Sequence, residues 1–298
     1  MWGRHHDRVP VGVIDVGSNT VRLLVVGDGR QLLTVREPIG LGAAVEQLGF
    51  IPADKLDEAA DVVEAFAELA RDAGAEELEV LITSPGRQAA NGDDLLDLLA
   101  LAARAPARVL SASEEGRLAF TGALMGASGL ARRRVAVVDV GGGSAQVAVG
   151  TRSTGPTWVH SLDIGSLRLT RRCLGGDPPG RDALRAAREE VERLLDDLDP
   201  PEPQAAIAVG GTARSLRRLV GTRLGRDELA EALDLLAETP QRTLIEQHDL
   251  PPHRAHTLAA GATIFAALQE RLRTPLKVSR TGIREGALAL LAERREAA

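Results

Sequence analysis

The chain has 298 residues, of which 44% are hydrophobic and 26% charged, as in an ordinary folded protein. These values exclude a largely disordered chain, and the length predicts two domains. The net charge of −6 argues against a general nucleic-acid or membrane surface, since such surfaces are usually basic. The single cysteine, Cys173, excludes an internal disulfide and indicates a reducing compartment. Because no apolar leader opens the chain, a cytoplasmic protein is expected.

The first half is predicted to alternate strands and helices. A strand that ends at Asp15 and two more at 21–26 and 31–36 precede an amphipathic helix from Pro52 to about Gly74. A strand at 78–82, a helix at 93–104, a strand at 108–110 and a helix from Ser113 follow. This order indicates an α/β domain, which we expect over residues 1–126.

The second half is predicted to repeat the three-stranded opening, and we expect its domain over residues 127–298 after a hinge of small residues at 127–129. Its strands are expected at 135–138, 145–149, 157–161, 205–209 and 276–278. Helices are expected at 166–173, at 182–198, after the glycine turn at 210–212, and three times between 227 and 273. A final helix over 283–296 is expected to pack back on the first domain.

Two apolar runs end in the same kind of loop. Residues 15–20 and 139–144 each begin with aspartate, continue through glycine and small polar residues, and align without a gap. Successive backbone N–H groups in such a turn form an anion site, and the aspartate can hold a cation or its waters opposite a phosphate. Two hairpins with ordinary Asp-x-Gly turns are the alternative. The duplication favours phosphate loops in two related half-molecules that share a ligand.

Seven motifs in this order resemble the exopolyphosphatase and guanosine pentaphosphate phosphohydrolase family (Ppx/GppA). They begin at Asp15, Thr83, Ser113, Asp139, Asp163, Gly210 and Thr281. The resemblance implies an α/β, duplicated actin-like (ribonuclease H-like) fold of two domains with an interdomain active-site cleft. The length is similar to that of the short, two-domain members. It also implies that water removes a terminal phosphoryl group from a phosphoanhydride chain, assisted by Mg²⁺ or another divalent cation.

The resemblance further implies which residues form the site. Glu115 is similar to the family's general base, although a glutamate in a first helical turn is also favoured by the helix dipole alone. Asp139 is implied as a catalytic and metal-binding carboxylate, and Asp15 as a second metal ligand. Phosphate binding is implied for Gly17, Ser18, Asn19, Thr20, Arg22, Arg87, Gly141, Gly142, Gly143, Ser144 and Arg254.

The chain departs from the family pattern in two places. Gln146 stands where the family usually has a glutamate that helps to bind the metal, and Gly40 stands where a basic residue is common. A glutamine keeps one acceptor oxygen but loses the negative charge, so we expect a lower affinity for the cation. Glu115 and Asp139 are unaffected.

Three functions follow as hypotheses. The first is a magnesium-dependent phosphohydrolase that acts on inorganic polyphosphate or a guanosine polyphosphate. The second is a weakly active or inactive sensor that binds the same ligands, as Gln146 suggests. The third is a nucleotide-dependent kinase or a chaperone-like protein of the actin-like class. We expect no nucleic-acid or membrane partner, and the resemblance leaves room for a homodimer.

Overall fold

The computed structural model describes residues 9–297. The chain forms two compact units. Unit 1 runs as far as Leu118 and also contains the segment from Arg284 onward, whereas unit 2 is Ala119–Ile283. The chain passes from unit 1 to unit 2 within the helix α5 (Ala112–Met125), so the division lies before the small-residue segment at which the sequence analysis placed it.

Unit 1 contains a five-stranded sheet in the order β3-β2-β1-β4-β5, in which β2 runs antiparallel to β1 and β3, and β4 runs parallel to β1 and β5. Its elements are β1 (Val11–Val16), β2 (Thr20–Gly27), β3 (Arg30–Pro38), α1 (Leu41–Leu48), α2 (Ala53–Asp72), β4 (Glu77–Ile82), α3 (Ser84–Gln88), α4 (Gly92–Ala103), β5 (Ala107–Val109), the first half of α5 and α12 (Ile283–Ala297) from Arg284 onward.

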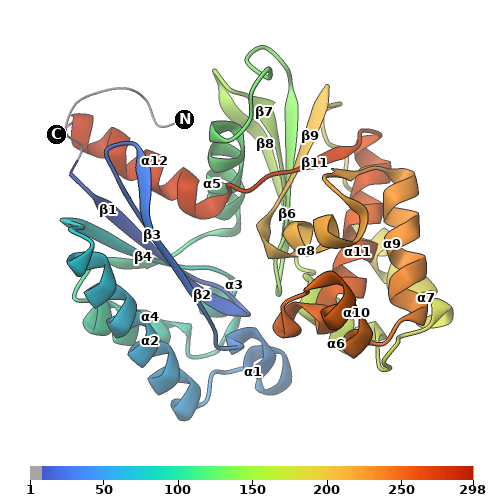
Figure 1. Cartoon of the computed structure of the whole chain (residues 1–298), viewed down its shortest axis with the longest axis horizontal. Helices are drawn as coiled ribbons and strands as arrows, with labels where there is room; N and C mark the ends of the chain where they lie inside the picture. Colours follow the sequence, from blue (N-terminus) through green and yellow to red (C-terminus); the bar gives the residue numbers. More distant parts are fainter. Residues whose placement is uncertain (1–8, 298) are drawn as a thin grey trace. The chain divides into compact units, whose positions relative to one another are not determined.

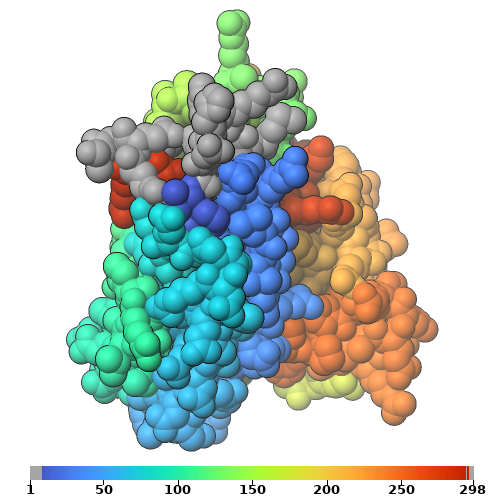
Figure 2. All heavy atoms as spheres, turned by 60° about the vertical axis from the view of Figure 1, so that its left-hand side comes forward, coloured from blue at the N-terminus to red at the C-terminus, as the bar shows by residue number. Residues whose placement is uncertain are grey.

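Both faces of this sheet are covered at β1, because all six of its residues are buried, whereas the edge strand β3 is mostly exposed. Ile14 and Val16 join a core with buried residues of α2 and α4. The outer surfaces of these two helices are exposed, and α2 is the light-blue to cyan surface in Figure 2. Since side chains alternate along a strand, Asp15 belongs to the opposite face, on which α12 lies in Figure 1.

Two helices of unit 1, α1 and α3, were not predicted from the sequence. α1 begins after Gly40, whose φ of 67° lies in the left-handed region, and it contains a second glycine in its first turn. α3 contains Pro85 and Gly86 in five residues. Glycine and proline oppose helix formation in isolation, so the apolar contacts of Leu41 and Val45 with the core of unit 1 stabilise α1 instead.

Unit 2 contains a six-stranded sheet in the order β10-β11-β9-β6-β7-β8. Its strands β8, β7, β6, β9 and β11 repeat the order and directions of the unit 1 sheet, and β10 is an addition. The elements are β6 (Val135–Val140), β7 (Ala145–Thr151), β8 (Gly155–Leu162), α6 (Ser166–Cys173), α7 (Arg181–Leu194), β9 (Ala205–Val209), α8 (Gly210–Val220), β10 (Arg223–Leu224), α9 (Arg226–Glu238), α10 (Gln241–His248), α11 (Pro252–Leu272) and β11 (Leu276–Val278).

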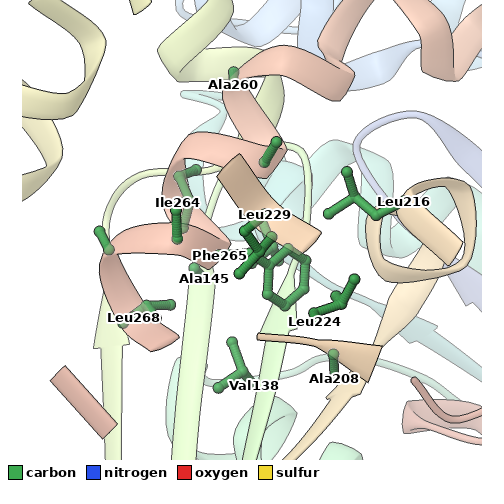
Figure 3. Close-up of a cluster of buried hydrophobic side chains, with 14 of the residues drawn as sticks. Val138, Ala145, Ala208, Leu216, Leu224, Leu229, Ala260, Ile264, Phe265 and Leu268 are labelled. Carbon is green, nitrogen blue, oxygen red and sulfur yellow. The ribbon is translucent and has the colours of Figure 1, made fainter. Parts of the chain in front are cut away.

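The core of unit 2 is built around α11, which is buried on nearly all sides. Figure 3 shows Phe265 of this helix beside Leu224 and Leu229. On the other face of the sheet, Val135 and Val137 pack against Phe120 of α5. Asp139 lies two residues beyond Val137 on the same strand and therefore belongs to the same face, on which α5 packs. Within residues 9–297, no helix is both long and apolar enough to span a bilayer.

Candidate functional site

The first loop lies between β1 and β2 in unit 1. Asp15 is the next-to-last residue of β1 and is buried, as are Ser18 and Thr20. The Gly17 N–H donates to the Thr20 carbonyl oxygen at 3.1 Å, which closes the turn. Beside it, the Ser18 and Ser84 hydroxyl oxygens lie 2.7 Å apart. The predicted loop is therefore a tight turn with hydroxyl groups gathered at one place.

The second loop, between β6 and β7 in unit 2, has the same internal geometry. The Gly141 N–H donates to the Ser144 carbonyl oxygen at 3.0 Å. Asp139 is buried, and its Oδ1 lies only 2.3 Å from where a Cβ of Gly210 would stand. Gly210 has a φ of 87°, so both its conformation and the close carboxylate require glycine. The glycine turn at 210–212 thus fits against the carboxylate.

The duplication extends to side-chain hydrogen bonds that the sequence analysis did not foresee. Arg22 Nε donates to Thr20 Oγ1 at 3.2 Å, and at the equivalent positions Gln146 Nε2 donates to Ser144 Oγ at 2.9 Å. A threonine that follows the neighbouring parallel strand, β4 in unit 1 and β9 in unit 2, supports each loop. Thr83 Oγ1 donates to the Val16 carbonyl oxygen at 3.3 Å, and Thr212 Oγ1 to that of Val140 at 2.8 Å. These paired contacts are the structural evidence for two related half-molecules.

Glu115 and Arg87 form an ion pair in unit 1. Arg87 Nη2 donates to Glu115 Oε2 at 2.8 Å, and Arg87 Nη1 donates to the Leu110 carbonyl oxygen at 2.6 Å. The Glu115 side chain is only 8% exposed. Arg87, which was expected to bind phosphate, therefore also holds the expected base. Because Ser84 of the same motif contacts Ser18, the segment Thr83–Arg87 connects the first loop to Glu115.

The neighbouring Glu114 has a different environment. Its carboxylate accepts hydrogen bonds from the Ser111 N–H and from Arg108, and nearly half of its side chain is exposed. The hydrogen bonds with Ser111 lower the pKa of Glu114. It stabilises the start of α5, whereas Glu115 points into the buried pair with Arg87.

We expect the replacement Arg87→Met to lower the free energy of unfolding by about 2 kcal/mol, because it leaves the buried Glu115 carboxylate without this partner. Urea denaturation measures the change. In a Glu115→Gln background the same replacement should cost clearly less, since the buried charge is gone. Equal costs in the two backgrounds would show that the ion pair contributes nothing to stability.

Arg284 is a residue of unit 1 to which the sequence analysis gave no role. Its Nη1 donates to the Leu23 carbonyl oxygen and to Thr34 Oγ1, both at 3.2 Å, so the start of the final helix is bonded to β2 and β3. Burial lowers the pKa of Arg284, and among its charged neighbours Arg22 lowers it further while Asp15 raises it. Arg284 thus adds a second guanidinium near Arg22 and the first loop. The signal was present in the motif from Thr281 to Gly286.

Arg254 is the predicted phosphate-binding arginine of unit 2. The residue is buried, and its guanidinium carbon lies 2.7 Å from where a Cβ of Gly211 would stand. Arg254 is on α11 and Gly211 on α8, so tertiary packing brings this predicted phosphate ligand to the glycine turn beside Asp139. The site residues therefore fall into two groups. Asp15, Arg22, Arg87 and Glu115 belong to unit 1, whereas Asp139, Gln146 and Arg254 belong to unit 2.

Asp15 and Asp139 are the carboxylates predicted to bind a divalent cation. Within the described part of the chain, no three histidine, cysteine, aspartate or glutamate side chains gather into a metal-binding group. Mg²⁺ does not need such a group, because it usually binds one or two carboxylates together with water and substrate phosphates. Asp15 and Asp139 each offer one buried carboxylate next to a phosphate-type loop. Each of these carboxylates, in its own unit, fits Mg²⁺ that is bound together with phosphate.

Two sheets of the same strand order, each with a glycine loop after an aspartate, define the class: a duplicated actin-like α/β protein, as predicted. The sequence profile of the Ppx/GppA phosphatase family matches residues 29–294, and the chain belongs to this family. The prediction of a hydrolase is confirmed at the level of the family.

Known proteins similar to the chain agree with this assignment. Exopolyphosphatase 1 of Mycobacterium tuberculosis is 31% identical over 93% of this chain and 86% of its own length. Exopolyphosphatase 2 of the same organism is 29% identical over 88% of this chain and 91% of its own length. A crystal structure of the Aquifex aeolicus Ppx/GppA family member superimposes with a TM-score of 0.81 at 26% identity, over 96% of this chain and 98% of that one.

Proposed function

We propose that the protein removes terminal phosphate groups from inorganic polyphosphate. The observation that carries this proposal is the duplicated loop, in which matching hydrogen bonds hold two sets of backbone N–H and hydroxyl groups after a buried aspartate. Such turns suit phosphate oxygens. The names of the mycobacterial relatives, exopolyphosphatases 1 and 2, favour polyphosphate as the substrate.

In this proposal Glu115 orients and deprotonates the attacking water. The water oxygen bonds to the terminal phosphorus, the bond from that phosphorus to the bridging oxygen breaks, and the shortened chain leaves with the bridging oxygen. Glu115 takes the proton of the water. Its hydrogen bond with Arg87 fixes the orientation of the carboxylate. Arg87 belongs to the same short helix as Ser84, whose hydroxyl contacts Ser18 of the first loop, and in this proposal it also attracts phosphate.

The remaining candidates bind phosphate or a cation. The loops 17–20 and 141–144 donate N–H and O–H groups other than the N–H groups of Gly17 and Gly141, which close the turns, and Arg22 and Arg254 supply positive charge. Asp15 and Asp139 would hold Mg²⁺, which when bound neutralises phosphate oxygens. Guanosine pentaphosphate is a second substrate in this proposal, since it ends in the same phosphoanhydride group.

A phosphate-release assay tests the proposal with polyphosphate, guanosine pentaphosphate and ATP, each with and without Mg²⁺. We expect release from polyphosphate that depends on Mg²⁺, and little from ATP. No release from any of the three at high protein concentration would contradict the hydrolase and favour the sensor. That alternative rests on Gln146, whose amide donates to Ser144 and Ser161 at the position where the family has a carboxylate.

The replacement Gln146→Glu should raise the affinity for Mg²⁺ about tenfold, because it adds a carboxylate on the strand position directly paired with Asp139. Competition of Mg²⁺ with Mn²⁺, followed by the Mn²⁺ spin-resonance signal, measures the affinity without turnover. The matched control is Gln146→Met, which also loses the amide hydrogen bonds but adds no charge. If the Gln146→Glu and Gln146→Met variants have equal affinities for Mg²⁺, the missing carboxylate does not limit metal binding.

A further inference from the structure

The turn between β8 and α6 lies directly behind the second loop of unit 2. A Cβ at Gly165 would stand 2.3 Å from the Gly142 carbonyl oxygen and 2.6 Å from the Gly143 nitrogen. The φ of Gly165 is −125°, which any residue can adopt. Close approach to the loop backbone, and not the conformation of Gly165 itself, therefore requires glycine here.

The start of α6 also binds the carbonyl groups of the loop. The Ser166 N–H and hydroxyl donate to the Gly141 carbonyl oxygen at 2.8 and 3.1 Å. The N–H groups of Leu167 and Arg168 donate to the Gly142 carbonyl oxygen at 2.9 and 3.2 Å. Four hydrogen bonds thus hold two successive carbonyl groups against the first turn of the helix.

These bonds determine where the N–H groups of the loop point. In a trans peptide the N–H is directed opposite to the C=O of the preceding residue. Because the carbonyl groups of Gly141 and Gly142 point at α6, the N–H groups of Gly142 and Gly143 point away from it. Two successive N–H groups on the same side form the anion-binding concavity that the sequence predicted.

The turn itself is held firmly. Ser166 is fully buried, and its carbonyl oxygen accepts a hydrogen bond from Thr170 Oγ1 at 2.7 Å. Arg168 forms an ion pair with Asp163 and donates to the Asp163 carbonyl oxygen at 3.2 Å, which closes the segment from 163 to 168. Because the segment from 163 to 168 is hydrogen-bonded at both ends, it can hold the second loop, which packs against it, in one position.

Unit 1 has a related arrangement, in which the bonded carbonyl groups lie one position further along the loop than in unit 2. The Gly42 N–H, in the first turn of α1, donates to the Ser18 carbonyl oxygen at 2.7 Å, and the Gly40 N–H donates to that of Asn19 at 3.3 Å. As α6 follows β8, α1 follows β3, the third strand of its unit. The recurrence of this support in both halves indicates that it serves the loops and is not incidental packing.

We propose that Gly165 and Ser166 are positioning residues, which set the second loop so that the N–H groups of Gly142 and Gly143 can bind a phosphate of the substrate. This role gives a function to the motif that begins at Asp163. It rests on the proposed function, because it assigns the turn to phosphate binding. Neither residue takes part in the bond-breaking step.

The test compares Gly165→Ala with Gly175→Ala. Both glycines flank α6, but a Cβ at Gly175 meets no atom within 4 Å. We expect Gly165→Ala to raise the KM for polyphosphate at least tenfold and Gly175→Ala to change it less than twofold. The Kd of tripolyphosphate, measured by calorimetry in a Glu115→Gln background to prevent turnover, should follow the KM.

A milder variant covers the case in which Gly165→Ala does not fold. Ser166→Ala removes only the hydrogen bond from the hydroxyl to the Gly141 carbonyl oxygen. It should raise the Kd of tripolyphosphate about three- to tenfold. The unfolding midpoint in urea is recorded for every variant. A purely structural role would lower that midpoint and leave the Kd of the folded fraction unchanged.

The outcomes separate the two proposals. If the unaltered protein neither releases phosphate from polyphosphate nor binds tripolyphosphate, the proposed function fails and the phosphate role of the turn fails with it. If the unaltered protein is active but Gly165→Ala and Ser166→Ala match Gly175→Ala in KM and Kd, the positioning role alone is overturned. Weaker binding in the first two variants supports it.

Discussion

Replacing Glu115 by glutamine is expected to slow phosphate release from polyphosphate by about 10²- to 10⁴-fold, the usual contribution of a general base. Glutamine keeps the size of the side chain and can still accept a hydrogen bond from Arg87, but it cannot take a proton from water. The KM should change little, because Glu115 is proposed to act on the water and not on the phosphate chain. Steady-state phosphate release at saturating Mg²⁺ measures both kcat and KM.

Glu114→Gln is the matched control for this prediction. It changes the adjacent residue in the same helix turn, whose carboxylate is bound by Ser111 and Arg108. We expect it to retain most of the activity and to lose about 1 kcal/mol of stability, as for a weakened helix cap. Activity of Glu115→Gln within a factor of three of the unaltered protein would remove Glu115 as the base.

The replacement Gly210→Ala is expected to lower kcat about 100-fold. Its Cβ would stand 2.3 Å from Asp139 Oδ1, so the carboxylate must move, and displacements of about 1 Å in a catalytic site can cost this much. The variant also forces alanine to a φ of 87°, which costs roughly 1 kcal/mol of stability. Phosphate release and urea denaturation separate the two effects.

Gly221→Ala provides the control at the other end of the same helix. Gly221 follows α8, has the same φ of 87°, and has no atom within 4 Å of its added Cβ. It should therefore lose a similar amount of stability while its kcat stays within about twofold. Equal kcat values for the two variants would show that the position of the Asp139 carboxylate does not control the reaction.

Much of the fold could be predicted because its signals are local. The strands that end at Asp15 and Asp139 are continuous apolar runs, and the structure has them as β1 and β6. The helix expected at 166–173 is α6 with the same bounds, and the three helices expected between 227 and 273 are α9, α10 and α11. α7 ends at Leu194 and not at 198, since the turn that follows keeps the apolar spacing without remaining helical.

The contacts of the candidate site were harder to predict. Arg87 and Glu115 are 28 residues apart, and no periodicity indicates that they form an ion pair. The hydrogen bond from Arg284 to Leu23 of β2 joins residues that are 261 positions apart in the sequence. Such pairings depend on which helices and strands pack against each other. The periodicity of a single sequence indicates which face of an element is buried, but not which other element packs against that face.

The sequence by itself determined the duplication, the two loops and the family, because these depend on the order of small, acidic and apolar residues along the chain. Only the tertiary structure decided how each loop is held. It placed Thr83 and Thr212 under the two loops, and the start of α6 behind the second. It also placed Gln146 in a hydrogen bond equivalent to that of Arg22. The bonds from Thr83, Thr212 and α6 end on backbone carbonyl groups, and such acceptors leave almost no mark on residue type beyond a few glycines where two backbone segments approach closely.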